Sequence, residues 1–356
     1  MAFHTMRLFT LFGQAQFGKL PSGERLKRIQ NSPQYKNGAF QNLSHTPDLT
    51  DGATYFSVSK DFFFGKHERR YPEKLIPSVK TNLHHMTKQE NVLVWFGHSS
   101  YYMQIEGKRI LVDPVLSGNA SPFRFTTKAF KGSDVYKTED LPEIDYLFLS
   151  HDHYDHLDYN TLVKIRTKVR TVICSLGTGS HLEYWGYEPN RLKELDWHEH
   201  IDLEDGFKVH SVPARHFSGR GFKRNQTLWS SFVLKTPAQQ IFIGGDSGYD
   251  THFAEIGRSF GGFDLAILEN GQYNKNWKHI HLMPNEILQA ARDLQAKRLF
   301  PVHSSKFALG THAWDEPLNL ISKNNALEKL NIITPMIGEK VELQNPEQVF
   351  SEWWKM

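Results

Sequence analysis

A short apolar run followed at once by a histidine-rich segment is the feature that most constrains this chain. Residues 146–149 read Y-L-F-L, and the next seven residues, Ser150 to His156, read S-H-D-H-Y-D-H. Such an apolar run predicts a buried strand, and the loop after it places its side chains along one rim of a sheet. Imidazole and carboxylate together suit zinc and its first-row neighbours. The H-x-H-x-D-H order therefore predicts a metal site at the end of a strand.

Three more apolar runs end next to a residue that can bind a metal ion. The runs, each with the donor that follows it, are 207–214 with His216, 240–245 with Asp246, and 298–302 with His303. Polar residues follow strands in most proteins, so each case alone has an ordinary explanation. Open sheets, however, gather their functional residues where strands end. Together with the histidine-rich loop, the three runs predict one shared site.

The donors are numerous enough for two metal ions. We expect one ion on three imidazoles, a second ion on a mixed set, and a carboxylate bridge between them: His151, His153 and His216; Asp155, His156 and His303; and Asp246 as the bridge. Two ions about 3.5–4 Å apart can share one hydroxide, and they lower the pKa of water towards about 7, which gives a nucleophile at neutral pH. Asp155 can also orient that water. The donor types favour zinc, and manganese or iron can occupy the same groups.

The chain changes character near residue 90. Residues 1–90 carry turn clusters and poor apolar periodicity, so we expect an N-terminal extension of loops and one or two short helices packed on the core. Residues 91–356 read as one domain in which strands, beginning at 92–96, recur with helices between them. Residues 283–296 give the clearest helical spacing. The fold class expected from this alternation is α/β, in layers.

Composition removes several classes of protein. The net charge is only +3, which leaves no broad basic field for nucleic acid. No stretch approaches the roughly 20 apolar residues of a spanning helix, so we expect a cytoplasmic protein or one peripheral to a membrane. The apolar segment 3–12 is expected to form a helix packed on the body. Cys174 is the single cysteine, which excludes an internal disulfide, and its strand-like run predicts that it is buried.

With these motifs in place, the chain resembles the metallo-β-lactamase superfamily, and most closely its N-acylphosphatidylethanolamine phospholipase D-like branch. The resemblance covers most of residues 90–315. The matching segments are W-F-G-H-S-S at 95–100, V-D-P-V at 112–115, L-D-W at 195–197, P-A-R-H-F-S-G-R at 213–220, N-Q-T-L-W at 225–229, G-D-S-G-Y at 245–249 and F-D-L-A at 263–266. The segment E-N-G-Q-Y at 269–273 departs from the family by being more polar.

The resemblance implies a four-layer αβ/βα sandwich with a dinuclear site between two sheets, onto which the seven donors carry over. It also implies hydrolysis of a phosphodiester in a membrane phospholipid, releasing phosphatidic acid and an N-acylethanolamine. His281 resembles the active-site histidine of the family and is expected to protonate the leaving group or bind a phosphate oxygen; with Asp155 and Asp246 it makes the predicted catalytic set. Phosphate contacts and a structural role are both open for Arg215, Arg220 and Tyr249. His98 and Asp113 are expected to support the metal site indirectly.

The sequence also allows other functional hypotheses. The same metal centre can serve a lactonase or another ester hydrolase resembling L-ascorbate-6-phosphate lactonase. A non-enzymatic metal-binding scaffold is disfavoured because none of the seven donors is missing. A redox di-iron role is disfavoured because that class carries an acid where His153 stands. The expected partner is a small molecule or a phospholipid, with peripheral contact to a membrane left open, no nucleic acid, and an oligomeric state that the sequence does not fix.

Overall fold

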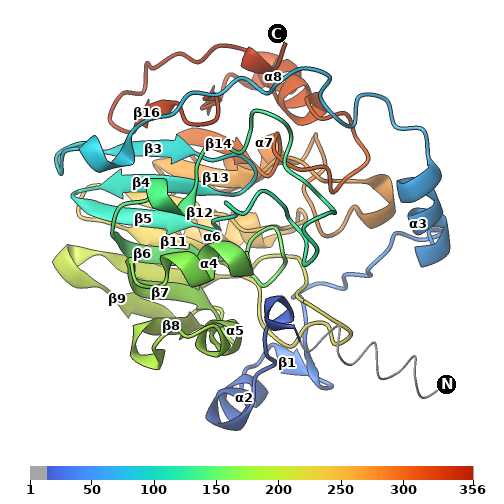
Figure 1. Cartoon of the computed structure of the whole chain (residues 1–356), viewed down its shortest axis with the longest axis vertical. Coiled ribbons are helices and arrows are strands. Elements are labelled where there is room, and N and C mark those ends of the chain that lie inside the picture. Colours follow the sequence, from blue (N-terminus) through green and yellow to red (C-terminus); the bar gives the residue numbers. More distant parts are fainter. Residues whose placement is uncertain (1–13, 356) are drawn as a thin grey trace.

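The computed structural model describes residues 14–355. The helix predicted over residues 3–12 lies outside this range. Within it, no helix combines the length and the apolar character needed to cross a lipid bilayer. Figure 1 shows two sheets, one behind the other, with helices on their outer faces.

The first sheet is mixed and has seven strands. From edge to edge they are β16 (Lys340–Glu342), β3 (Val92–Trp95), β4 (Tyr101–Ile105), β5 (Lys108–Val112), β6 (Ile144–Leu149), β7 (Val169–Ser175) and β8 (Leu192–Leu195). The pairs from β16 to β5 are antiparallel, and those from β5 to β8 are parallel. The parallel half contains β6, whose end carries the histidine-rich loop.

The second sheet has the same plan. Its strands are β15 (Asn331–Ile332), β14 (Arg298–Val302), β13 (Leu265–Glu269), β12 (Gln240–Ile243), β11 (Ser231–Lys235), β10 (Lys208–Val212) and β9 (His200–Asp202). The pairs from β9 to β12 are antiparallel, and those from β12 to β15 are parallel. The strands predicted from the apolar runs that begin at residues 92, 146, 207, 240 and 298 are thereby confirmed.

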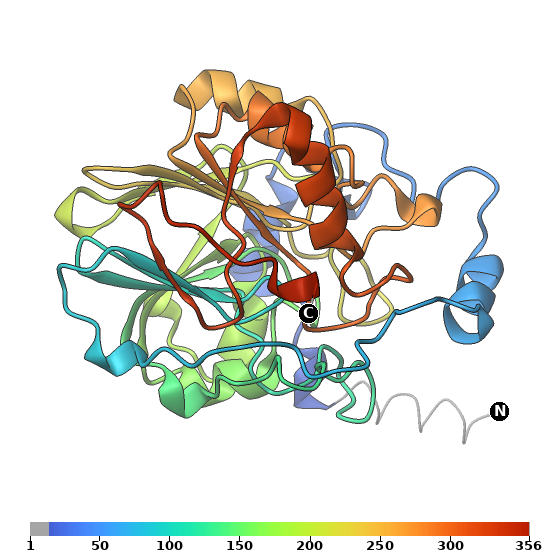
Figure 2. The ribbon, with the colours of Figure 1, turned by 90° about the horizontal axis from the view of Figure 1, so that it is seen from above.

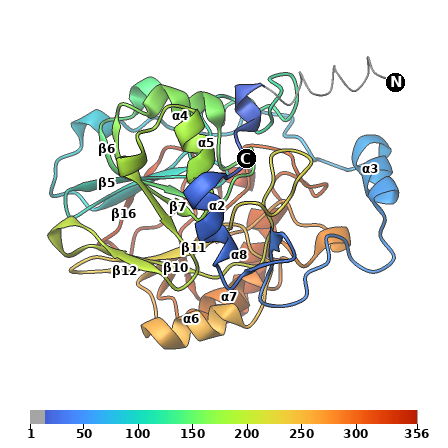
Figure 3. The ribbon, with the colours of Figure 1, turned by 90° about the horizontal axis from the view of Figure 1, so that it is seen from below.

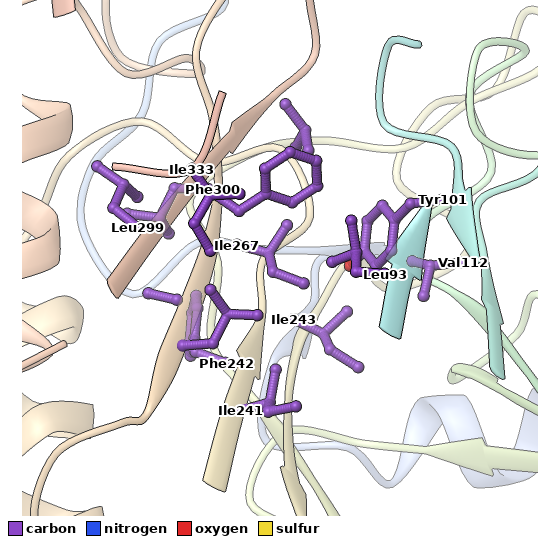
Figure 4. Close-up of a cluster of buried hydrophobic side chains, with 14 of the residues drawn as sticks. Leu93, Tyr101, Val112, Ile241, Phe242, Ile243, Ile267, Leu299, Phe300 and Ile333 are labelled. Atoms are coloured by element: carbon purple, nitrogen blue, oxygen red, sulfur yellow. The ribbon is translucent and has the colours of Figure 1, made fainter. Parts of the chain in front are cut away.

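The two sheets pack face to face. In β3, Leu93 and Trp95 point into the space between the sheets, whereas Val92 and Val94 belong to the outer layer of the first sheet. Figure 4 shows Leu93, Tyr101 and Val112 facing Ile243 and Ile267 of the second sheet. Complete burial of each such side chain contributes about 1.5–3 kcal/mol. Because strands of this kind are buried on both faces, they read as continuous apolar runs.

Helices cover both outer faces, as Figure 2 shows in the view along the layers. The first sheet is covered by α4 (Tyr159–Ile165) and α5 (Gly179–Tyr184), whose Leu162, Ile165 and Leu182 pack in its outer layer. The second sheet is covered by α6 (His252–Phe260), α7 (Ile287–Asp293) and α8 (Glu316–Glu328). The fold is therefore the four-layer αβ/βα sandwich that the sequence resemblance implied. Cys174 is buried in β7 as expected.

Residues 14–90 hold two short helices, as predicted: α2 (Gly23–Gln30) and α3 (Tyr55–Phe64). A small hairpin, β1 (Tyr35–Lys36) with β2 (Ala39–Phe40), lies between them. Figure 3 shows α2 against the lower edge of the sandwich and α3 standing out from the body at one side. Short 3-10 turns complete the described chain: η1 (Ala15–Phe17), η2 (Leu83–His85), η3 (Thr138–Asp140), η4 (Pro189–Arg191), η5 (Glu204–Gly206), η6 (Lys275–Trp277) and η7 (Trp353–Lys355).

The helix predicted over residues 283–296 is too long at both ends. Helix α7 begins only at Ile287, because Pro284 to Glu286 form a turn in which the Glu286 carboxylate accepts a hydrogen bond from the Met283 N–H (2.8 Å). The helix ends before Gln295, which has a left-handed backbone with φ of 55°. The predicted apolar face is nevertheless correct, since Ile287, Ala290, Ala291 and Leu294 are all buried.

Candidate metal centre and active site

The histidine-rich loop starts where β6 ends and is fixed from several sides. Asp113, which follows β5, accepts hydrogen bonds from the Ser150 N–H (2.9 Å) and hydroxyl (2.6 Å). The Asp152 carboxylate accepts the Gly219 N–H (2.7 Å) and lies 3.2 Å from the His181 ring. The loop then leads into α4, which Asp158 caps by accepting the Asn160 N–H (3.1 Å). A loop held this closely can aim several side chains at one point.

The first group of predicted donors is assembled as expected. His151 Nε2 lies 2.9 Å from His153 Nδ1, which lies 3.2 Å from His216 Nε2. Burial lowers the pKa of both His151 and His216 well below the usual value, helped by the neighbouring rings. These imidazoles are therefore neutral and offer lone pairs, as a metal ion requires.

The second group lies directly beside the first. The Asp155 carboxylate is 3.4 Å from His156 Nε2 and 3.3 Å from His303 Nε2. Asp246 lies between the groups, with Oδ2 3.2 Å from His156 Nε2, 3.2 Å from His303 Nε2 and 3.7 Å from His216 Nε2. The structure thus brings all seven predicted donors together, from loops that are up to 152 residues apart in the chain (303 − 151).

The chemistry of these residues fits two divalent cations. Among the described residues, His156 Nε2 and Asp246 Oδ1 are buried and have no hydrogen-bond partner. Burial alone would lower the pKa of His303, but the Asp246 and Asp155 carboxylates raise it to about 10. The two buried carboxylates are therefore stabilised by positive charge close to them, and divalent ions supply that charge when bound. The buried His/Asp cluster is consistent with a dinuclear site, and the assignment of each ligand stays a prediction.

A surrounding shell of hydrogen bonds orients the donors. His98 Nε2 lies 2.8 Å from Asp155 Oδ2, Asp113 Oδ2 lies 2.8 Å from His156 Nδ1, and the Ile280 carbonyl lies 2.8 Å from His216 Nδ1. Engaging Nδ1 on the outer side leaves Nε2 directed inward, which is how ligating histidines are usually held. His98 and Asp113 therefore lie beside the donors, as predicted for residues that support the site indirectly.

Backbone geometry at the site is also unusual. His98, Asp113 and His303 all adopt positive φ angles, of 55°, 40° and 69°. Residues other than glycine rarely enter this region, and such conformations concentrate at functional sites. The His98 and His303 turns are tied together, because the His303 N–H donates to the His98 carbonyl (3.0 Å).

His281 lies at the edge of the donor cluster. Its ring centroid is 5.0 Å from that of His216 and 5.3 Å from that of His303. Its Nδ1 lies 2.6 Å from the Glu269 carboxylate. The side chain keeps 11% of its surface exposed and lines a cavity of about 500 Å³, so it can reach a bound molecule.

That cavity opens onto the donors and has largely apolar walls. Its lining includes His153, Asp155, Asp246, His281 and His303 from the cluster, and Leu49, Val58, Phe217, Trp277, Ile280 and Leu309 as apolar wall. Asp48, Tyr55 and Arg224 lie at the rim, where Arg224 Nη1 contacts the Asp48 carboxylate at 2.6 Å and the Tyr55 hydroxyl donates to the same carboxylate (2.5 Å). The N-terminal extension thereby supplies part of the cavity.

The three candidates for phosphate contact do not line this cavity. Arg215 donates to Thr46 Oγ1 and to the carbonyls of His45 and Tyr249. Arg220 is buried and donates to the carbonyls of Asp152, Leu157 and Gln16, and the Tyr249 hydroxyl donates to Asp293. These side chains fix loops around the site, which is the structural role that the sequence left open for them.

Sequence reasoning missed Glu269 as a site residue. It is the last residue of β13, directly after an apolar run, as Asp246 follows β12 and His303 follows β14. The rule that found those two residues could have found it. The rim residues Asp48 and Tyr55 gave no comparable signal, because their place at the cavity depends on long-range packing.

Comparisons with known proteins agree with this geometry. The family described as the beta-lactamase superfamily domain matches residues 108–304. The uncharacterized protein Rv0906 of Mycobacterium tuberculosis is 34% identical over 92% of this chain and 88% of its own length. An N-acyl-phosphatidylethanolamine-hydrolyzing phospholipase D of Caenorhabditis elegans is 27% identical over 89% of this chain and 94% of its own.

Solved structures show the same fold at low sequence identity. The isothiocyanate hydrolase from Delia radicum gut bacteria has a TM-score of 0.55 at 18% identity and covers 70% of this chain and 98% of its own. Igni18, a metallo hydrolase of Ignicoccus hospitalis, has a TM-score of 0.53 at 18% identity and covers 71% of this chain and 98% of its own. The chain belongs to the metallo-β-lactamase superfamily and carries in that fold a His/Asp site of the kind that metal-dependent hydrolysis requires.

Proposed function

We propose that this protein is a metal-dependent phosphodiesterase of phospholipase D type that acts on an N-acylphosphatidylethanolamine-like amphiphile. The observation that carries the proposal is the convergence of seven His/Asp donors and His281 at the base of a cavity with apolar walls. Support also comes from relatives named as N-acyl-phosphatidylethanolamine-hydrolyzing phospholipases D, among them a mitochondrial protein of Saccharomyces cerevisiae that is 32% identical over 71% of this chain and 54% of its own length.

The reaction needs an activated water, charge stabilisation at phosphorus and a proton for the leaving alkoxide. His151, His153, Asp155, His156, His216, Asp246 and His303 would hold the divalent cations, which when bound would supply Lewis acidity and lower the pKa of water. The Asp155 carboxylate can orient that water, because a hydrogen bond between its Oδ2 and the His98 ring fixes its position. His281 has Nδ1 engaged with Glu269, so its Nε2 is the atom that can give a proton to the leaving oxygen.

The shape of the cavity favours an amphiphile over a small polar lactone. Six apolar side chains, from Leu49 to Leu309, line its wall above the polar base. An acyl chain gains about 25 cal/mol per Å² of apolar surface that it buries. A sugar lactone would leave its hydroxyl groups without hydrogen-bond partners against the same walls. The phosphodiester would then lie at the base and the chains would extend towards the rim.

We further propose that the protein meets this substrate at a membrane surface through α3. None of its residues is buried, and Phe56, Phe63 and Phe64 are 79%, 73% and 83% exposed. The same helix places Tyr55 and Val58 at the cavity, so the apolar surface lies beside the entrance. Lys60 and Lys66 are exposed nearby, and Lys223 follows the exposed Phe222, between the cavity-lining residues Gly221 and Arg224. Aromatic residues flanked by lysines suit the interface of an anionic phospholipid bilayer.

The substrate class can be tested on one metal-replete preparation. The purified protein is incubated with an N-acylphosphatidylethanolamine in mixed micelles, with bis-p-nitrophenyl phosphate and with a lactone panel. We expect the lipid to yield phosphatidic acid and an N-acylethanolamine, with slower hydrolysis of the small diester. Lactone opening without cleavage of either phosphodiester would contradict the proposal and favour the lactonase reading.

A further inference from the structure

Glu269 is a buried carboxylate that lies behind the site, against the His281 ring. It ends β13 and is only 2% exposed. A carboxylate at this depth is costly unless hydrogen bonds or charges compensate it. The contacts of the Glu269 carboxylate therefore indicate its role.

Its two oxygens face different partners. Oε1 accepts hydrogen bonds from the backbone N–H groups of Ser247 (2.7 Å) and Leu282 (3.2 Å). Oε2 lies 2.6 Å from His281 Nδ1 and 3.2 Å from His303 Nδ1. The two backbone donors fix the carboxylate plane, one from the loop that carries Asp246 and one from the loop that carries His281. Glu269 therefore cannot swing away from the His281 ring.

We infer that Glu269 is a positioning residue that makes a carboxylate–histidine pair with His281, an assignment that rests on the proposed function. By accepting a hydrogen bond from Nδ1–H, the carboxylate fixes the ring orientation and leaves Nε2 directed to the cavity. In hydrolysis, the water oxygen bonds to phosphorus, the bond from phosphorus to the leaving oxygen breaks, and Nε2 gives that oxygen its proton. The ring is neutral after this transfer, and the proton lost by the water restores it; Glu269 stabilises the ring whenever it carries both protons.

A third cation is the competing explanation, because Asp246, Glu269, His281 and His303 each offer an atom within 4.8 Å of the others. The contacts favour the pair. Oε1 is already satisfied by two N–H donors, and the 2.6 Å that separates Oε2 from His281 Nδ1 is within hydrogen-bond reach. Metal content distinguishes the two explanations.

The variant Glu269→Gln tests the pair, because it keeps the size of the side chain but removes the charge. Its amide oxygen can still accept the backbone N–H groups, while the amide nitrogen faces Nδ1 and cannot accept its proton. We expect kcat to fall about 10- to 100-fold, the effect typical of residues that orient a functional histidine, with KM within about twofold and two ions per chain retained. In a His281→Ala background, Glu269→Gln should cause no further loss, since its effect passes through His281.

Glu255→Gln is the matched control, since it makes the same chemical change on an exposed position of α6. Wild-type kcat in Glu269→Gln, a full additional loss in the His281→Ala background, or a loss of bound metal would each overturn the inference. Nitrogen-15 NMR of the histidine rings in the metal-loaded wild-type protein gives an answer that needs no variant at position 269. It should show a His281 Nδ1 proton in a strong hydrogen bond, assigned by its disappearance in His281→Ala. An inactive protein with that proton contradicts only the proposed function, whereas an active protein without it contradicts the pair.

Discussion

Asp246 has the most connected position in the site, because one carboxylate oxygen lies within 4 Å of histidines from both groups. It comes three residues after the end of β12, behind Gly244 and Gly245, and it is buried. Such a carboxylate can hold two cations at a fixed separation. The residues around it, His98, Asp113 and Glu269, then decide how each donor is aimed.

Replacing a donor should remove both metal and activity. In His153→Ala or Asp246→Ala we expect fewer than two ions per chain and a kcat/KM below about one-thousandth of the wild-type value, which is a loss of about 4 kcal/mol of transition-state stabilisation. Elemental analysis and phosphodiester assays on the same sample measure both quantities. His200→Ala, at an exposed position of β9, is the control. Full activity in a variant that still binds two ions would show that the donor was misassigned.

His252 should make the fold sensitive to acid. Burial lowers its pKa to about 4, and its Nε2 lies 3.1 Å from the Ser247 hydroxyl. The unfolded value is about 6.5, so between these values the unfolded chain binds more protons and stability falls as the pH falls. The contribution is complete above about pH 6.5, and its loss by pH 4 is at most about 3 kcal/mol.

Urea unfolding of the wild type and His252→Gln, at pH 7.5 and pH 4.5 in the same metal state, isolates this contribution. The free energy of unfolding of the wild type, relative to that of His252→Gln, should be about 2 kcal/mol lower at pH 4.5 than at pH 7.5. An advantage that is equal at both pH values would show that His252 does not titrate in this range.

At the level of the elements, the strands could be predicted because burial on both faces makes each one a continuous apolar run. The donors could be predicted because each follows such a run, and parallel strands bring their ends to one rim. The start of α7 was misplaced, because Pro284 is compatible with a helix but the Glu286 side chain forms a turn there. The contributions of Asp48 and Tyr55 could not be predicted, because contacts with Arg224 of a distant loop place them.

The site also depends on a close approach between elements at Gly245. A Cβ at this position would lie 2.7 Å from Ser150 Cβ and 2.9 Å from the Ser230 carbonyl. Gly245→Ala should therefore push the end of β12 away from the histidine-rich loop, costing about 1–3 kcal/mol of stability and weakening metal binding by misplacing Asp246.

Gly261→Ala is the control for this variant. It has a left-handed backbone with φ of 74° but no atom within 4 Å of the added Cβ. It should cost about 1 kcal/mol through backbone strain and leave metal content unchanged, as measured by thermal unfolding and elemental analysis. Normal metal affinity in Gly245→Ala would refute the role of this close approach.

At the level of the whole molecule, the sandwich presents its site at one rim and the N-terminal extension completes the cavity there. Figures 1 and 2 show α3 projecting beyond the body at that side of the chain. The division into an extension at 1–90 and a domain at 91–356 stays a prediction. Joint use of both parts at the cavity suggests that the extension belongs to the functional unit.

Membrane contact can be tested by replacing two phenylalanines of α3. Phe63→Ser with Phe64→Ser should weaken binding to vesicles that contain anionic phospholipid by about tenfold or more, because each buried Phe contributes up to about 1.5–3 kcal/mol. Hydrolysis of soluble bis-p-nitrophenyl phosphate should stay the same. Leu327→Ser, on α8 and 92% exposed, is the control in the cosedimentation assay. Equal vesicle binding by all three proteins would exclude α3 as the contact.

A metal titration tests the central claim most directly. Protein stripped by a chelator is titrated with zinc or manganese, while ion content and cleavage of the N-acylated phospholipid are followed together. We expect activity to be absent in the stripped protein and to reach its maximum as the second ion per chain binds. Undiminished cleavage by protein without bound metal, or two bound ions with no cleavage of any phosphodiester, would contradict the claim.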